Sequence, residues 1–132
     1  MFYINYQFLD YTILAKYITK NLPFVEHVAL MGLEHTGYTP FNIDKLWIDP
    51  FDYQNELKQT VELLDAYNMN VSIYNLQHCV IPRALWGFTQ KSISAWKNDY
   101  LEKCQSCNAK TDCGGFFSSS LKKHSDYISP IL

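Results

Sequence analysis

The sequence has no basic cluster, no long apolar run and no secretion signal, and each absence excludes a class of protein. It carries 11 Lys and Arg against 13 Asp and Glu, a net charge of −2, and its most basic stretch is the pair Lys122-Lys123. That balance excludes the basic footprint of a nucleic-acid-binding protein. No apolar run reaches the roughly 20 residues of a membrane span. We therefore expect neither nucleic acid nor membrane as a partner.

The first residues, Met1-Phe-Tyr-Ile-Asn-Tyr6, lack the basic and apolar regions of a signal peptide. This start favours a reducing, cytoplasmic setting, in which disulfides are uncommon. The chain has 132 residues, of which 48% are hydrophobic and 16% aromatic. That composition is enough for a folded chain with a modest core.

Four cysteines form the most informative pattern. Cys104, Cys107 and Cys113 lie within ten residues, Cys79 lies upstream, and the spacing is C-x24-C-x2-C-x5-C. A C-x2-C turn points two sulfurs at one metal, and the glycines after Cys113 allow a close backbone approach and positive φ. Four thiolates complete the ligand set of a tetrahedral zinc ion or of an iron–sulfur cluster. We predict one metal centre on these four residues.

Four cysteines are also compatible with two arrangements that bind no metal. Two disulfides would use them all but need an oxidising compartment, which the N-terminal sequence does not favour. Four unrelated buried thiols are the second alternative, although a glycine-flanked loop is a poor place for them. Spacing alone does not choose between zinc and an iron–sulfur cluster.

The first half of the chain predicts an α/β fold. Apolar residues at helical spacing favour a helix over 10–20, and Asp49-Pro50 begins a second helix that runs to about Tyr67. Apolar runs predict strands at Phe24–Met31 and Val71–Leu76. Strand, helix and strand in this order form a βαβ unit with parallel pairing. Short helices are further expected at Ser94–Leu101 and Leu121–Ile128.

Loops that leave the carboxyl ends of parallel strands carry the chemistry in such folds. Two loops qualify, Gly32–Tyr38 and Gln77-His78-Cys79. The second places Cys79 where a functional ligand is expected, with His78 beside it as a supporting donor or a substitute ligand. The residues alone favour an exposed loop position for His35.

The string Leu46-Trp-Ile-Asp-Pro50, Val71-Ser-Ile-Tyr-Asn75, Cys79 and Cys104-x2-Cys107-x5-Cys113-Gly-Gly-Phe-Phe-Ser-Ser resembles the C-terminal portion of a radical S-adenosylmethionine (SAM) peptide maturase. The nearest type is the C-type maturase of the His-Xaa-Ser repeat peptide system, and the resemblance runs from about Val28 onward. The C-x2-C-x5-C part is similar to the auxiliary-cluster signature of SPASM and twitch extensions.

Two departures limit what the resemblance implies. The C-x3-C-x2-C motif that holds the catalytic cluster is absent, since Tyr100 stands four positions before Cys104. A full SPASM region also has a cysteine where this chain has Phe117. The resemblance therefore implies one auxiliary cluster and no SAM-cleaving site within these residues.

The resemblance implies a partial (βα) barrel remnant over 1–78 and a Cys-rich, metal-binding extension over 79–132. It implies an iron–sulfur cluster, [4Fe–4S], on Cys79, Cys104, Cys107 and Cys113, and places Glu34 and His35 near the barrel mouth, where SAM or substrate is held. SAM would require a companion N-terminal half, which becomes an expected partner beside a ribosomally made peptide substrate.

Two functions follow from different classes. In the first, the chain is a fragment or split partner of a radical SAM enzyme that modifies a ribosomal peptide, and is not active alone. In the second, zinc staples an irregular C-terminal half onto a small α/β core and makes a non-catalytic interaction module. Self-association is expected as well, because a two-stranded sheet would leave edges and the apolar Val28, Leu30, Val71 and Ile73 uncovered.

Overall fold

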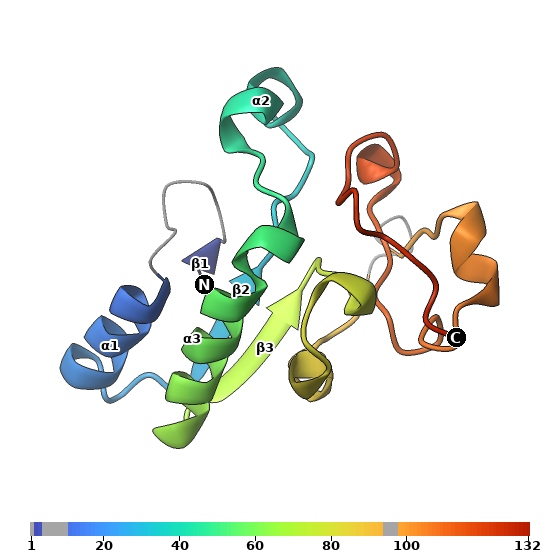
Figure 1. Ribbon diagram of the computed structural model, residues 1–132. Coiled ribbons are helices and arrows are strands. Elements are labelled where there is room, and N and C mark those ends of the chain that lie inside the picture. Colours follow the sequence, from blue (N-terminus) through green and yellow to red (C-terminus); the bar gives the residue numbers. More distant parts are fainter. Residues whose placement is uncertain (1, 4–10, 94–97) are drawn as a thin grey trace.

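A parallel sheet forms the centre of the N-terminal half (Figure 1). The computed structural model describes residues 2–3, 11–93 and 98–132. Three strands, β1 (Phe2–Tyr3), β2 (His27–Met31) and β3 (Asn70–Tyr74), lie in the order β1-β2-β3, and both pairings are parallel. Val28 lies opposite Val71 and Leu30 opposite Ile73. The predicted α/β class and parallel pairing are confirmed, and β1 is a strand that the sequence did not indicate.

Two helices connect these strands. The helix α1 (Tyr11–Asn21) buries Tyr11, Ala15 and Ile18, which recur at helical spacing. The helix α3 (Gln54–Ala66) follows a 3₁₀ turn at Pro50–Tyr53, where the Asp49 side chain accepts the Phe51 N–H at 3.0 Å. The predicted helix start at Asp49-Pro50 is thus confirmed. A short helix, α2 (Ile43–Leu46), lies between β2 and α3.

The helix α3 ends at Ala66, one residue before the end expected near Tyr67. Leu57, Val61 and Leu64 have no exposed surface, whereas Tyr67 lies beyond the helix and is 59% exposed. Asn68 then ends the helix with a φ of 60°, as expected of a left-handed cap. Phe24 is the other error, since β2 begins only at His27 and Phe24 is exposed.

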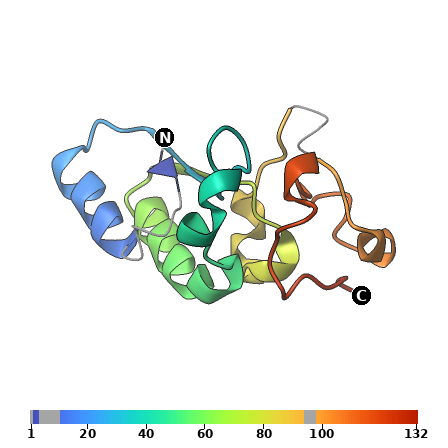
Figure 2. The same cartoon turned by 90° about the horizontal axis from the view of Figure 1, so that it is seen from above.

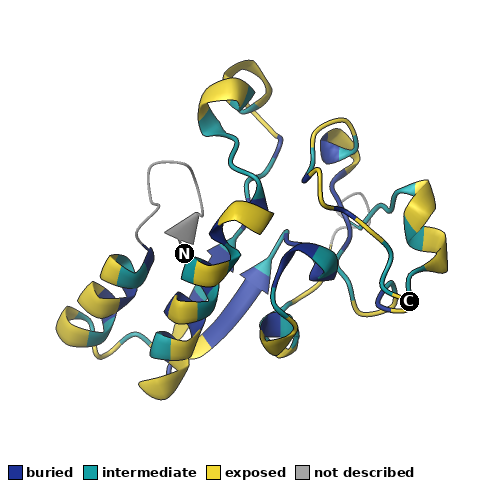
Figure 3. Cartoon of the chain, viewed as in Figure 1, coloured by how far each residue is buried: buried dark blue, intermediate teal, exposed yellow. Residues whose placement is uncertain are grey.

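Both helices lie on one side of the sheet, as the view from above shows (Figure 2). That arrangement follows from consecutive parallel strands joined by crossovers of one hand. The apolar residues of β2 and β3 belong to the same buried cluster as the stripes of α1 and α3 (Figure 3). Our expectation that Val28, Leu30, Val71 and Ile73 would be uncovered is therefore wrong: all four are buried.

The C-terminal half is built of turns. It contains 3₁₀ turns at His78–Val80, Arg83–Phe88, Glu102–Ser106 and Ser118–Ser120. The helix expected at Leu121–Ile128 is wrong, because this segment consists of turns and bends. Half of the helix expected at Ser94–Leu101 falls on 94–97, outside the described residues, and in the other half Asp99 forms a β-bridge to Phe116. Within the described segments, no helix is both long and apolar enough to span a membrane.

Several contacts join the two halves across the expected boundary at 78–79. Thr89 forms a parallel β-bridge to Ile73 at the edge of β3. The N–H of the next residue, Gln90, donates to the Ile73 carbonyl at 2.8 Å. The second carboxylate oxygen of Asp49 accepts the Asp126 N–H at 3.0 Å. Phe51 stacks on Tyr127, with ring centroids 4.0 Å apart. The turn-rich half is thus packed against the α/β core.

Candidate metal centre

Cys79 lies just beyond the carboxyl end of β3. After Tyr74 the chain turns through Asn75, whose φ is 66°, and enters the 3₁₀ turn His78–Val80. The Val80 N–H closes this turn on the Gln77 carbonyl at 3.1 Å. Cys79 is half-buried and packs against the core cluster. The sheet therefore fixes the first of the four thiols at the strand end that the sequence indicated.

Cys104 and Cys107 lie on one tight turn. The 3₁₀ segment Glu102–Ser106 is closed by the Cys104 N–H to the Leu101 carbonyl at 2.9 Å, and the Cys107 N–H donates to the Cys104 carbonyl at 3.1 Å. This local bonding holds the two thiols on one turn, as the C-x2-C spacing predicted.

Cys113 is held by a second turn and by the glycine that follows it. Its N–H donates to the Ala109 carbonyl at 2.9 Å, and its carbonyl accepts the Tyr100 hydroxyl at 2.7 Å. Gly115 has a φ of 71°, which L side chains rarely adopt, and its carbonyl accepts the buried Gln77 amide at 2.8 Å. That bond ties the loop after β3 to the loop after Cys113.

All four thiols line one pocket, the cysteine pocket, which has about 330 Å³ of empty space. The rest of its wall comes from Gln77 and His78 after β3, from Tyr100, from the Cys104–Cys113 segment, from Phe116 and from the tail, and its exposed surface is largely apolar. These residues include Ala109, Phe116, Ile128 and Ile131. The structure therefore brings together the four cysteines that the sequence singled out, across 24 intervening residues between the first and second.

Backbone N–H groups point at these sulfurs. The Ile131 N–H donates to Cys107 Sγ at 3.3 Å. Burial raises the pKa of the Cys79 and Cys113 thiols, and their mutual proximity to Cys104 adds to the rise. Hydrogen bonds from the backbone at Ser129 to Cys79, and at His78 and Gly115 to Cys113, act in the opposite direction on each pKa. The backbone is thus arranged to receive thiolates in a site that otherwise favours thiols.

The four thiols are not grouped as a metal site in the described part of this structure. All four are free, and among the described residues no three His, Cys, Asp or Glu side chains are grouped as a site for a metal ion. A single tetrahedral zinc ion needs its sulfurs about 3.8 Å apart. The four side chains would have to be brought within bonding distance of one centre, whether that centre is a zinc ion or an iron–sulfur cluster. The donor set fits a thiolate-bound centre in its chemistry.

His78 lies at the rim of the cysteine pocket with a defined tautomer. Its ring stacks on Trp86, with centroids 4.6 Å apart, and its Nε2 lies 2.8 Å from the Thr89 hydroxyl oxygen. That hydroxyl already donates to the Trp86 carbonyl at 2.7 Å, so Nε2 must carry the proton and donate. The buried Nδ1 is then an acceptor without a hydrogen-bond partner among the described residues.

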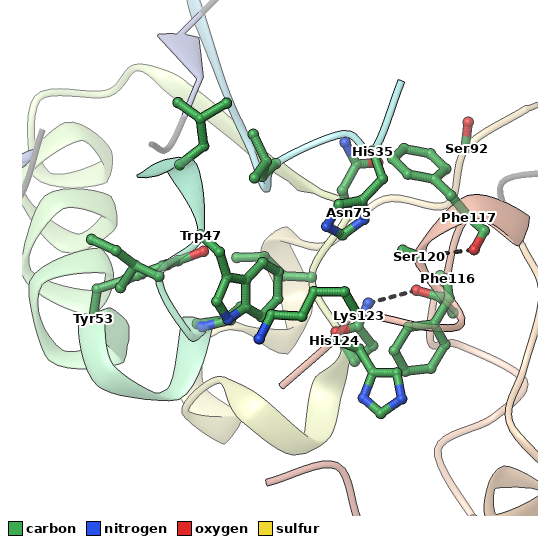
Figure 4. Close-up of a pocket in the computed structure, with 18 of the residues that line it drawn as sticks. His35, Trp47, Tyr53, Asn75, Ser92, Phe116, Phe117, Ser120, Lys123 and His124 are labelled. Atoms are coloured by element: carbon green, nitrogen blue, oxygen red, sulfur yellow. Dashed lines mark hydrogen bonds between the residues drawn. The ribbon is translucent and has the colours of Figure 1, made fainter. Parts of the chain in front are cut away.

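Glu34 and His35 do not line the cysteine pocket. His35 is only 7% exposed, so the expectation of an exposed loop residue is wrong. It stacks on Trp47, with ring centroids 5.7 Å apart, and lines a second pocket (Figure 4). Glu34 is half-buried and is not among the residues that line that pocket. His124 also lines it and packs edge-on against Phe116.

Sequence reasoning missed the residues that join the loops. Gln77, Tyr100 and Lys123 each make their contacts to segments distant in the chain. Single polar residues of this kind carry no periodic pattern, so no signal in the sequence separates them from surface residues.

No protein-family model, curated protein or solved structure matches this chain. The resemblance to radical SAM peptide maturases therefore stays a prediction.

Proposed function

We propose that Cys79, Cys104, Cys107 and Cys113 bind one iron–sulfur cluster, [4Fe–4S]. The observation that supports this most is the meeting of four thiols on one largely apolar pocket. Backbone N–H groups directed at the sulfurs are a second support, since hydrogen bonds to the sulfurs and limited solvent access set the potential of such clusters. When bound, the cluster supplies a one-electron redox centre.

The chain's own residues would hold and shield this centre. Phe116, Ile128 and Ile131 keep bulk water from the sulfurs, and the tail N–H groups stabilise their charge. Gln77 fixes the distance between the loop of Cys79 and the loop of Cys113 through its bond to Gly115. These roles are those of an auxiliary-cluster region.

We further propose that this region works within a radical SAM system that modifies a ribosomal peptide. Its partners would be the peptide and a companion part that carries the C-x3-C-x2-C motif. The resemblance of the cysteine string motivates this proposal, and consecutive parallel strands with both helices on one side are the elements of which (βα) barrels are built.

The test is metal content after anaerobic reconstitution with iron and sulfide. We expect a brown protein with about four irons per chain. Each single Cys→Ala variant should lose most of the iron and the broad visible absorption. Ser129→Ala is the matched control, because it removes a hydroxyl beside the pocket but keeps the backbone N–H that faces Cys79.

A zinc centre is the second candidate, because the same four thiolates form a complete zinc site. A colourless protein that takes up one zinc per chain and no iron would replace the cluster with this structural staple. Full iron content in Cys79→Ala would show that Cys79 is not a ligand and would overturn the four-cysteine site.

A further inference from the structure

The second pocket, here the His35 pocket, lies at the carboxyl ends of β2 and β3. It has about 670 Å³ of empty space, part of it open to solvent. Leu33 and His35 reach it from the loop after β2, and Asn75, Leu76 and Gln77 from the loop after β3. The carboxyl ends of parallel strands are where open α/β sheets bind ligands. The position alone makes this pocket a candidate for a ligand site.

His35 has two buried ring nitrogens that point to a missing partner. Neither Nδ1 nor Nε2 has a hydrogen-bond partner among the described residues, although the residue is only 7% exposed. Burying such groups without a hydrogen-bond partner destabilises the fold. Burial, and then the nearby charge of Lys123, lower the pKa of His35, so the ring is neutral at pH 7 and offers one donor and one acceptor. A ligand that bonds to the ring would recover this cost.

The charge of the pocket favours an anion. The Lys123 ammonium lies over the Trp47 ring, 5.4 Å from its centroid, and forms no ion pair with a described residue. The other ionisable residues that line the pocket are His35, Tyr53 and His124, and no Asp or Glu is among the described residues of its wall. A negatively charged group would meet one cation and no opposing carboxylate.

Flat side chains form the apolar part of the wall. Trp47 lies on one side of the pocket, and Phe116 and Phe117 lie on the other (Figure 4). Aromatic walls with a few polar groups are typical of sites for small molecules, and rings stack well on such walls. The lining suits a small ligand with a flat body.

We propose that the His35 pocket binds a small molecule that carries a carboxylate or a phosphate on a flat aromatic body. The anionic group lies between Lys123 and His35, and the body packs between Trp47 and Phe116. None of these residues is a cysteine, so the proposal stands whether or not the cysteine pocket holds a cluster.

Calorimetric titration of the full chain tests this site with three probes. They are 3-phenylpropionate, phenyl phosphate and the neutral 3-phenylpropanol. We expect one or both anions to bind, and the stronger one to identify the natural group as carboxylate or phosphate. Lys123→Met and His35→Gln should each weaken that anion by at least about tenfold, as loss of a charge-assisted bond predicts.

Matched controls separate the site from nonspecific charge. Lys122→Met removes an adjacent exposed cation that does not line the pocket, and His27→Gln removes a histidine at the opposite end of β2; both should leave affinity unchanged. The NMR signals of the His35 ring should also shift when the anion is added. Binding of 3-phenylpropanol as tight as that of the anions, unchanged affinity in Lys123→Met, or no binding of any probe would overturn the proposal.

Discussion

Two buried histidines, His35 and His78, give the folded chain groups that resist protonation. Burial lowers the pKa of both, and for His35 the Lys123 charge lowers it further. Asp112 acts in the opposite direction on the pKa of His78. A histidine whose pKa is lowered by folding binds fewer protons in the native than in the unfolded state. The unfolded chain is therefore favoured as the pH falls.

We expect a loss of stability in mild acid. The contribution of each histidine is complete above its unfolded pKa of about 6.5 and decreases as the pH falls below that value. The limiting slope is about 1.4 kcal/mol per pH unit for each group. Urea unfolding of the metal-free chain between pH 7.5 and 5.5 measures it.

His35→Gln should reduce the pH dependence of that free energy of unfolding, because glutamine does not titrate. If the free energy of unfolding of His35→Gln depends on pH as steeply as that of the parent chain, the pKa of His35 does not rise on unfolding.

At the scale of elements, the turn Cys113–Phe116 carries the tightest constraint. Gly115 has a positive φ, and a Cβ there would overlap the backbone oxygen of Asp99, which forms a β-bridge to the next residue, Phe116. Gly114 differs, because its nearest neighbour to an added Cβ is the Gln90 carbonyl oxygen at 3.6 Å and its φ is not positive. Only the second glycine of the pair is required by the backbone.

Gly115→Ala should therefore cost about 2–4 kcal/mol, the combined effect of left-handed strain and the clash. Gly114→Ala should cost less than about 1 kcal/mol. Equilibrium urea unfolding of the two variants side by side checks this contrast. Equal losses would show that the Asp99–Phe116 bridge yields easily and that Gly115 is not special.

The sequence predicted regular elements better than turns. Apolar residues recur at the period of a helix in α1 and α3 and of a buried strand in β2 and β3, because one face of each element packs in the core. The types of these elements and the parallel pairing of the strands were therefore predicted correctly. The error at Leu121–Ile128 has a physical cause, since the apolar residues there pack against the core and the pocket without helical turns. The meeting of the four cysteines was expected because thiols carry a distinctive chemistry, whereas the His35 pocket depends on contacts between distant loops; the metal centre on those cysteines stays a prediction.

At the scale of the whole molecule, the α/β core and the turn-rich half differ in what holds them. The core is held by continuous apolar packing among α1, α3 and the sheet. The segment Cys104–Cys113 has local turns, a few long-range bonds and an apolar pocket wall. A centre on four thiolates would close the loop between Cys79 and Cys104, and closing a loop of this order stabilises a fold by about 3–4 kcal/mol.

Removal of the metal should thus loosen one half only. In hydrogen exchange of the reconstituted chain, a chelator should speed exchange of backbone amides in 104–115 by at least about tenfold. Amides of α3 and β3 should keep their protection. The same chelator should change nothing in Cys79→Ala. A uniform loss of protection over both halves would mean that the centre holds the entire fold.

Gln77 and Phe116 line both the cysteine pocket and the His35 pocket, and this common wall has a thermodynamic consequence. A molecule that shifts this wall on entering one pocket changes the free energy of filling the other. By reciprocity, the factor by which the aromatic anion alters the affinity for metal must equal the factor by which metal alters the affinity for the anion. A titration of metal with and without the anion and a titration of the anion with and without metal must therefore yield the same factor. In Gln77→Leu, this coupling factor should move toward one.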